Sequence, residues 1–234
     1  MDLIAPGVYR LTGLIAGNVY LISDPDGVTL INASIALSAR HVLNQVRAVG
    51  RRVGDVRRVL VTNAHPDHVG ALPRIVRETG AEVWASALER PVIEGRMRVP
   101  VAPPETLSPL ARRFFGKPGP ILPFVPVARE LRDGEVLAEV MDGLHVVAAP
   151  GRTKGHLAFW HPKRRLLFCG DSIFHMNGLG LPMPFFTVDR DENIRSIRQL
   201  LDLNPQIACF GHGPPLMNNT MPKLQRFARK VGAL

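Results

Sequence analysis

Four short apolar runs in this chain each end in a loop that carries glycine together with histidine or aspartate. The runs are VLVT before residues 63–68, HVVAAP before 151–156, LLFC before 170–171 and IACF before 211–213. Apolar runs of this length, bounded by turn residues, are typical of buried strands. In layered α/β proteins the loops that follow such strands converge at one edge of the sheet, where ligands bind. We therefore expect the four loops to meet at one site.

The rest of the chain predicts strands and helices within one domain. Residues 19–23 and 28–32 are rich in β-formers and are separated by Asp-Pro-Asp-Gly, which is turn chemistry typical of a hairpin. Apolar residues recur at helical spacing over 38–49, 69–79 and 192–203. A length of 234 residues suits a single domain, and 21 glycines with 21 prolines predict many turns. We expect one α/β domain over residues 1–234.

A proline-rich segment over residues 89–133 interrupts this pattern. It has no sustained period, and it carries bulky side chains at Met97, Phe114, Phe115 and Phe124. A long stretch without periodicity inside a compact domain is usually a lid or a binding insertion. The alternative is an irregular excursion of the surface. We expect a lid-like insertion over the site.

The four loops supply four histidines and two aspartates. These candidate metal ligands are His65, Asp67, His68, His156, Asp171 and His212. Neutral imidazoles and carboxylates suit zinc, iron or manganese, and six ligands exceed what one tetrahedral ion takes. A pair of ions bridged by a carboxylate is therefore an economical arrangement. Each motif alone also occurs in ordinary turns or helix caps, so it is the joint occurrence that predicts a metal site.

In this order the motifs resemble those of the metallo-β-lactamase fold hydrolases. TNAHPDH, PGRTKGH, CGD and FGHG match the family's THxHxDH, PGHTxGH, GD and GHG, and the resemblance extends from near Val8 to about Leu216. It implies an αββα four-layer sandwich. It also implies that one metal is bound by His65 and His156, that Asp171 bridges, and that the second metal is bound by Asp67, His68 and His212.

Three positions depart from the family pattern. Asn63 replaces the first histidine, and because an amide oxygen is a weaker zinc ligand than imidazole, the first site should bind metal less tightly or stay partly empty. Alternatively, Asn63 only forms hydrogen bonds within its loop. Asn32 replaces an acidic residue and is expected beside the same loop. Arg152 replaces a histidine and would orient an anionic group of the substrate, unless it is an exposed loop charge.

One further histidine is a candidate for the substrate site. His175 lies four residues after Asp171 and would contact the substrate or donate a proton, the alternative being a packed or surface histidine.

The predicted function is metal-dependent hydrolysis. A hydroxide on the metal would attack a carbonyl ester, lactone or thioester, and Asp67 would hold the water and pass its proton to the leaving group. The expected cofactor is zinc, one or two ions per chain, with iron or manganese as alternatives. Two other functions stay open: a phosphodiesterase or nuclease of the same fold, and a degenerate, non-catalytic metal-binding protein, which the changes at Asn63 and Asn32 would permit.

The charge and the cysteines bear on partners and location. Of the 29 basic residues, 24 are arginines and five are lysines, distributed as pairs instead of one dense run, so the formal charge of +9 favours a solvated basic surface over a nucleic-acid groove. Cys169 and Cys209 both lie in apolar runs, which fits a reducing compartment. Without a signal peptide or a spanning run of about 18 apolar residues, we expect a cytoplasmic protein with a small-molecule substrate and no membrane or nucleic-acid partner. The sequence does not indicate an oligomeric state.

Overall fold

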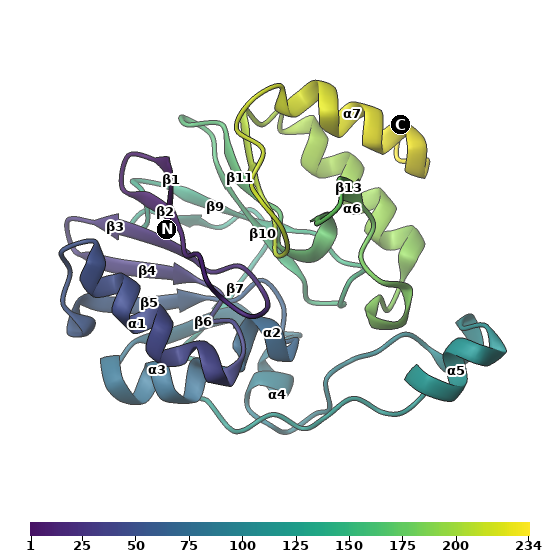
Figure 1. Ribbon diagram of the computed structural model, residues 1–234, viewed down its shortest axis with the longest axis horizontal. Coiled ribbons are helices and arrows are strands. Elements are labelled where there is room, and N and C mark those ends of the chain that lie inside the picture. The colour runs from purple at the N-terminus through teal and green to yellow at the C-terminus, as the bar shows by residue number, and fades with distance from the viewer.

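Two sheets form the centre of the molecule, and helices cover their outer faces (Figure 1). The computed structural model describes residues 1–234, the side chain of Phe115 excepted. The first sheet has seven strands, hydrogen-bonded in chain order: β1 (Asp2–Ala5), β2 (Val8–Arg10), β3 (Tyr20–Asp24), β4 (Gly27–Ile31), β5 (Val56–Leu60), β6 (Glu82–Ser86) and β7 (Arg129–Leu131). The second follows the order β14-β11-β10-β9-β8, with β8 (Val136–Leu137), β9 (Leu144–Ala148), β10 (Leu157–His161), β11 (Leu166–Phe168) and β14 (Ile207–Cys209). A separate pair is formed by β12 (Phe174–His175) and β13 (Leu179–Gly180).

Each sheet combines antiparallel and parallel pairs. In the first sheet, β1 to β4 pair antiparallel, whereas β4 to β7 run parallel. β3 and β4 are the predicted hairpin, which turns where Asp24 pairs with Gly27. In the second sheet β11 and β14 are parallel, so their carboxyl ends meet at one edge. This arrangement brings the loops after β5, β11 and β14 toward the same region.

Seven α-helices are described, several of them short. They are α1 (Ala39–Ala48), α2 (Pro66–Val69), α3 (Leu72–Thr79), α4 (Arg90–Ile93), α5 (Pro109–Phe115), α6 (Arg190–Asp202) and α7 (Thr220–Val231). α1, α3 and α6 confirm the three predicted helical segments, while α7 was not predicted although Leu224 and Phe227 share its buried face. α6 begins where the Asp189 side chain accepts a hydrogen bond from the Glu192 N–H at 2.9 Å. Within the described residues, no helix is long and apolar enough to cross a lipid bilayer.

Alternation along the strands produces three layers of core. In β3, Leu21 packs with the residues of α1 and α3, whereas its neighbour Ile22 packs between the two sheets. In β10, Phe159 faces the first sheet, and Trp160 packs on the other side with residues of α6 and α7. Because each sheet buries both faces, the order of layers is helix, sheet, sheet, helix. This confirms the predicted αββα sandwich.

The proline-rich segment is more ordered than the sequence suggested. Its last residues form β7, which pairs with β6 inside the first sheet, and α4 at its start buries Val92 and Ile93. The irregular part is therefore confined to about 94–128, where α5 stands away from the body of the molecule (Figure 1). Of the bulky residues noted there, Met97, Phe114 and Phe124 are exposed, and the side chain of Phe115 lies outside the described part.

Candidate metal centre

The four predicted loops meet at one edge of the sandwich. The chain leaves β5 through residues 62–65 and starts α2 at Pro66, whose missing N–H costs nothing at the first position of a helix. Backbone hydrogen bonds join the loops: the Leu157 N–H donates to the Thr62 carbonyl at 2.8 Å, and the Gly211 N–H donates to the Gly170 carbonyl at 2.7 Å. The convergence expected from the sequence is present.

Asp67, His68 and His212 form a compact cluster with Asp171. One ligand atom from each of the first three lies within 4.8 Å of the others. Nε2 of His212 is 3.0 Å from Asp67 Oδ2 and 3.6 Å from Asp171 Oδ1, and Nε2 of His68 is 3.0 Å from the same oxygen of Asp171. Imidazole nitrogens and carboxylate oxygens are the donors that zinc, iron and manganese accept.

Two observations show that this cluster fits a cation. The buried atoms His68 Nε2, His212 Nε2 and Asp171 Oδ1 have no hydrogen-bond partner among the described residues, although buried polar atoms normally have one. The second observation is the space kept at Gly211, where a Cβ would lie 2.1 Å from Asp171 Oδ1 and 3.0 Å from a ring carbon of His68. Any side chain at Gly211 would enter the cluster.

The other predicted ligands, His65 and His156, lie beside this cluster and are engaged differently. Nε2 of His156 accepts a hydrogen bond from the Asp171 backbone N–H at 2.9 Å. The Asn63 amide N–H donates to Nδ1 of His65 at 2.7 Å. A neutral imidazole has one acceptor nitrogen and one N–H, so each of these contacts takes up the lone pair of its ring.

Asn63 does not point at the cluster as a ligand would. Its oxygen accepts from the Thr62 hydroxyl at 2.9 Å, and its nitrogen binds His65, so both ends of the amide are used inside the loop. These contacts favour the alternative, a residue that bonds within its loop, and the assignment of Asn63 as a metal ligand stays a prediction. Asn32 has the neighbouring place that was expected, because its Oδ1 accepts from the Thr62 N–H at 3.0 Å.

Arg152 is neither exposed nor free. Its Nε lies 3.0 Å from Asp171 Oδ2, and the two side chains are 3% and 0% exposed. Another guanidinium nitrogen donates to the Phe186 carbonyl, and the guanidinium carbon lies 5.8 Å from the Phe174 ring and 5.5 Å from the Phe186 ring. The alternative of an exposed loop charge is therefore wrong. The primary partner of this cation is the carboxylate of Asp171, and because Arg152 also lines the cavity described below, its role in substrate binding stays a prediction.

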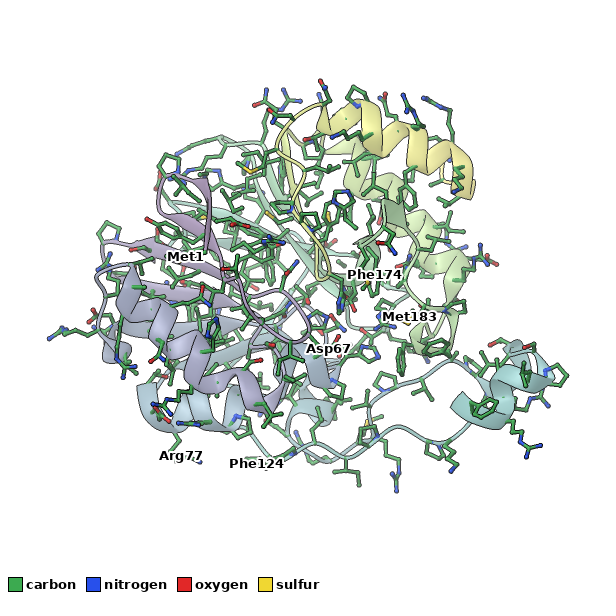
Figure 2. The ribbon with its side chains drawn as sticks, viewed as in Figure 1. Met1, Asp67, Arg77, Phe124, Phe174 and Met183 are labelled. Atoms are coloured by element: carbon green, nitrogen blue, oxygen red, sulfur yellow. The ribbon has the colours of Figure 1, made fainter. Side chains whose placement is uncertain are left out.

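An apolar cavity of about 460 Å³ opens from the centre. His65, Asp67, Arg152, His212 and Lys117 line it together with mostly apolar residues, among them Ile35, Val99, Val101, Phe114, Phe174, Met183 and Phe186. Figure 2 shows Asp67, Phe174 and Met183 around this region, between the two halves of the molecule. A larger cavity of about 640 Å³, lined by Leu107, Leu181 and Asp189 among others, lies elsewhere and includes none of the candidate ligands.

His175 takes a different position from the predicted one. The residues that line the 460 Å³ cavity do not include it. Its Nδ1–H donates to the Pro214 carbonyl at 2.7 Å, and its backbone N–H donates to the carbonyl of His212 at 3.0 Å. His175 thus supports the loop that carries His212, and the structure gives it no contact with the cavity.

Burial and charge set the protonation states. Burial lowers the pKa of His65 and of His156 to about 3, and the charge of Arg152 adds to the effect at His65. Burial alone would raise the pKa of Asp171, but His68 and Arg152 outweigh it and hold that pKa well below its usual range. The pKa of Asp67 is lowered in the same way, against its burial, by His68 and His212. At neutral pH the carboxylates of Asp67 and Asp171 are therefore ionised and the rings of His65 and His156 are neutral, whereas the two carboxylates raise the pKa of the buried His68 above its usual value.

Comparison with known proteins identifies the family. Residues 12–212 match the model of the metallo-beta-lactamase superfamily. The chain belongs to this superfamily. The match confirms the predicted family and the expectation of an enzyme from it, and the superfamily's fold implies that a divalent metal is bound.

Two relatives and one solved structure illustrate the likeness to other superfamily members. The probable metallo-hydrolase YflN of Bacillus subtilis (strain 168) is 28% identical over 255 residues, which cover 98% of this chain and 93% of the relative. The hydroxyacylglutathione hydrolase GloC of Haemophilus influenzae is 33% identical over 159 residues, covering 66% of this chain and 68% of the relative. A metallo-beta-lactamase family protein of Thermus thermophilus superposes with a TM-score of 0.74 at 24% identity, covering 99% of this chain and 81% of that one, and shows the fold alone.

One buried residue near the metal centre, Glu89, was not predicted from the sequence. It is 2% exposed, and its two carboxylate oxygens accept from the Ala64 N–H at 2.7 Å and from the Gly155 N–H at 3.2 Å. It therefore ties the loop that carries His65 to the loop that carries His156. The only signal in the sequence was its position after a strand, β6, whose carboxyl end lies at the same edge.

Proposed function

We propose that this chain is a metal-dependent hydrolase of carbonyl esters or thioesters, lactones included, with an apolar acyl group. One observation carries the proposal: the cluster of Asp67, His68, His212 and Asp171 opens into an apolar cavity of about 460 Å³. A cluster of metal donors at the end of an apolar cavity is the arrangement expected for hydrolysis of a small organic substrate.

Asp67, His68, His212 and Asp171 Oδ1 are the groups that would hold the metal. A bound divalent cation would supply Lewis-acid chemistry, polarising the scissile carbonyl and lowering the pKa of water to about 7. Zinc is the first candidate, and iron and manganese accept the same donors.

Asp67 is placed to handle the proton. Its carboxylate is ionised and lines the cavity, and its Oδ2 is held 3.0 Å from His212 Nε2. We assign it the task of accepting the proton of the attacking water at a carboxylate oxygen and passing it to the leaving group. The neighbouring Asp171 is fully buried, so it lacks the access to solvent and substrate that this task needs.

The walls of the cavity indicate the part of the substrate that is not cleaved. Val99, Val101 and Phe114 come from the segment 89–133, and Phe174, Met183 and Phe186 come from the second half of the chain. The backbone N–H of Ala102 donates to the Phe185 carbonyl at 3.1 Å, which fastens this segment across the opening. We propose that the segment acts as a lid-like wall within a single domain of residues 1–234 and selects apolar acyl groups.

The relatives support the thioester as one candidate bond. GloC is named a hydroxyacylglutathione hydrolase, and the bond in such a substrate is a thioester. Both ester and thioester hydrolysis use attack on a carbonyl carbon, so one cluster could serve either. A cytoplasmic location would supply thioester substrates and remains our prediction.

A panel of substrates tests the proposal. Protein reconstituted with zinc or manganese is assayed on p-nitrophenyl esters of increasing acyl length, an S-acylglutathione thioester, an alkyl lactone and bis(p-nitrophenyl) phosphate. We expect hydrolysis of a carbonyl substrate that improves with acyl length. Asp67→Asn and Asp171→Asn should each lower kcat/KM by about 100-fold or more, while the exposed carboxylate change Asp202→Asn, at the end of α6, should leave it unchanged.

The same panel contains the contrary outcomes. Cleavage of the phosphodiester alone, with rates that fall steeply as salt rises, would favour a nuclease. Metal binding without turnover of any substrate would favour the non-catalytic protein.

A further inference from the structure

The two oxygens of Asp171 face two different partners. Oδ1 faces His68 and His212, at 3.0 and 3.6 Å, on the side of the metal cluster. Oδ2 faces the guanidinium of Arg152 at 3.0 Å on the other side. A carboxylate that bridges two metal ions presents one oxygen to each of them. Here Arg152 faces Oδ2, where the second of two bridged ions would lie.

Arg152 is held in this position from several directions. Besides the ion pair, the guanidinium donates to the Phe186 carbonyl and lies over the rings of Phe174 and Phe186. The side chain is 3% exposed, so water contributes little to its solvation. Because a buried guanidinium needs a fixed negative partner, it will not leave Asp171 without leaving a charge unpaired.

Each histidine on the Arg152 side already uses one ring nitrogen as an acceptor. His65 accepts at Nδ1 from Asn63, and His156 accepts at Nε2 from the backbone N–H of Asp171, while the other ring nitrogens, His65 Nε2 and His156 Nδ1, are buried without a partner. In each neutral ring the remaining nitrogen then carries the hydrogen. Asn63 stands where a further nitrogen ligand would be needed, and its amide is already bonded at both ends.

The net charge of the centre also favours a single divalent cation. The two carboxylates of Asp67 and Asp171 and the guanidinium of Arg152 together carry one net negative charge. One divalent cation leaves a single positive charge, which a substrate anion or hydroxide balances. A second divalent cation next to the guanidinium would instead raise the net charge of this buried space to +3.

We infer that Arg152 takes the place of one of two metal ions, so that this chain binds a single divalent cation, at Asp67, His68, His212 and Asp171 Oδ1. The inference rests on the metal-binding part of the proposed function. Arg152 then acts as a positioning residue: it fixes Asp171 and supplies a permanent positive charge at the edge of the substrate cavity.

Metal stoichiometry tests this without any substrate. The chain is stripped with a chelator, titrated with Zn²⁺ or Mn²⁺ by calorimetry, and checked by elemental analysis after gel filtration. We expect the wild type to retain one ion per chain, bound about 100-fold or more tighter than any second ion. In the double variant, Arg152→Gln removes the positive charge of the guanidinium. Asn63→His supplies an imidazole and removes the amide that donates to His65 Nδ1. This variant should retain two metal ions per chain.

Arg58→Gln is the matched control, because Arg58 is also a buried arginine, 7% exposed and paired with Asp26, at a distance from the centre. It should keep the wild-type stoichiometry. Two tightly bound ions in the wild type would overturn the inference while leaving the proposed function intact, and this result does not depend on whether the variants fold. A folded double variant that still retains only one ion would also overturn it. A wild type that binds no metal would refute the proposed function itself.

Discussion

Replacing Gly211 with alanine should remove metal binding by a purely steric route. The added Cβ would lie 2.1 Å from Asp171 Oδ1, whereas ordinary van der Waals contact begins near 3.4 Å. The carboxylate must therefore move by more than about 1 Å, and metal–ligand distances tolerate only about 0.2 Å. Gly211 is not among the residues with a positive φ, so an alanine there strains no backbone dihedral and the fold should persist.

The size of the effect follows from the loss of one anionic ligand. If the affinity falls about 100-fold, a free metal concentration of about 100 times the wild-type Kd stabilises the wild type by about 2.7 kcal/mol and the variant by about 0.4 kcal/mol. For a chain of this length, a change of about 1 kcal/mol shifts Tm by about 2–4 °C. The metal-induced rise in Tm should therefore fall from about 5–10 °C to about 1 °C.

The assay compares Tm with and without metal, because overpacking by itself is expected to lower the Tm of the metal-free variant. Gly54→Ala is the control, since a Cβ at Gly54 meets nothing within 4 Å. An unchanged metal-induced rise in Gly211→Ala would refute the assignment of Asp171 Oδ1 as a ligand.

Three other outcomes can be measured on the same preparations. Glu89→Ala leaves the buried Ala64 and Gly155 N–H groups without their acceptor and should lower the free energy of unfolding by about 3 kcal/mol, measured by urea denaturation against the exposed control Glu105→Ala. The metal-free protein should lose stability as pH falls from about 6.5 to about 5, because in this range His65 and His156 take up protons only when unfolded. The slope, up to about 2.7 kcal/mol per pH unit, should be halved by His65→Gln, and a flat profile would contradict their buried neutral state. Val101→Trp narrows the apolar cavity and should raise KM for long acyl esters by about 10-fold with little change in kcat, whereas Leu88→Trp, at an exposed position, should not.

The sequence was most informative where the pattern is local. A strand that ends in a polar loop is visible within about ten residues, which is why the loops holding Asp67, Asp171 and His212 could be expected together from the sequence alone. The hairpin of β3 and β4 could be predicted for the same reason, because four consecutive residues specify its turn. The layers followed from the family resemblance and were confirmed by the three cores.

The electrostatic details depend on contacts between distant residues and could not be predicted. Arg152 and Asp171 are 19 positions apart, and Glu89 binds donors 25 and 66 positions away. An isolated acid or arginine has no periodicity that distinguishes a buried partner from a solvated one. β7 escaped notice for a related reason: three residues, two of them charged, carry no strand pattern and are held by pairing with β6.

The position of the bound metal is the most direct test of the centre. An anomalous difference map, recorded at the absorption edge of the metal from crystals of the metal-loaded protein, locates the ion without reference to activity. The account predicts one peak, enclosed by Asp67, His68, His212 and Asp171 Oδ1, with the guanidinium of Arg152 still paired to Oδ2. A peak between His65 and His156, or Arg152 displaced from Asp171 by a second ion, would contradict it.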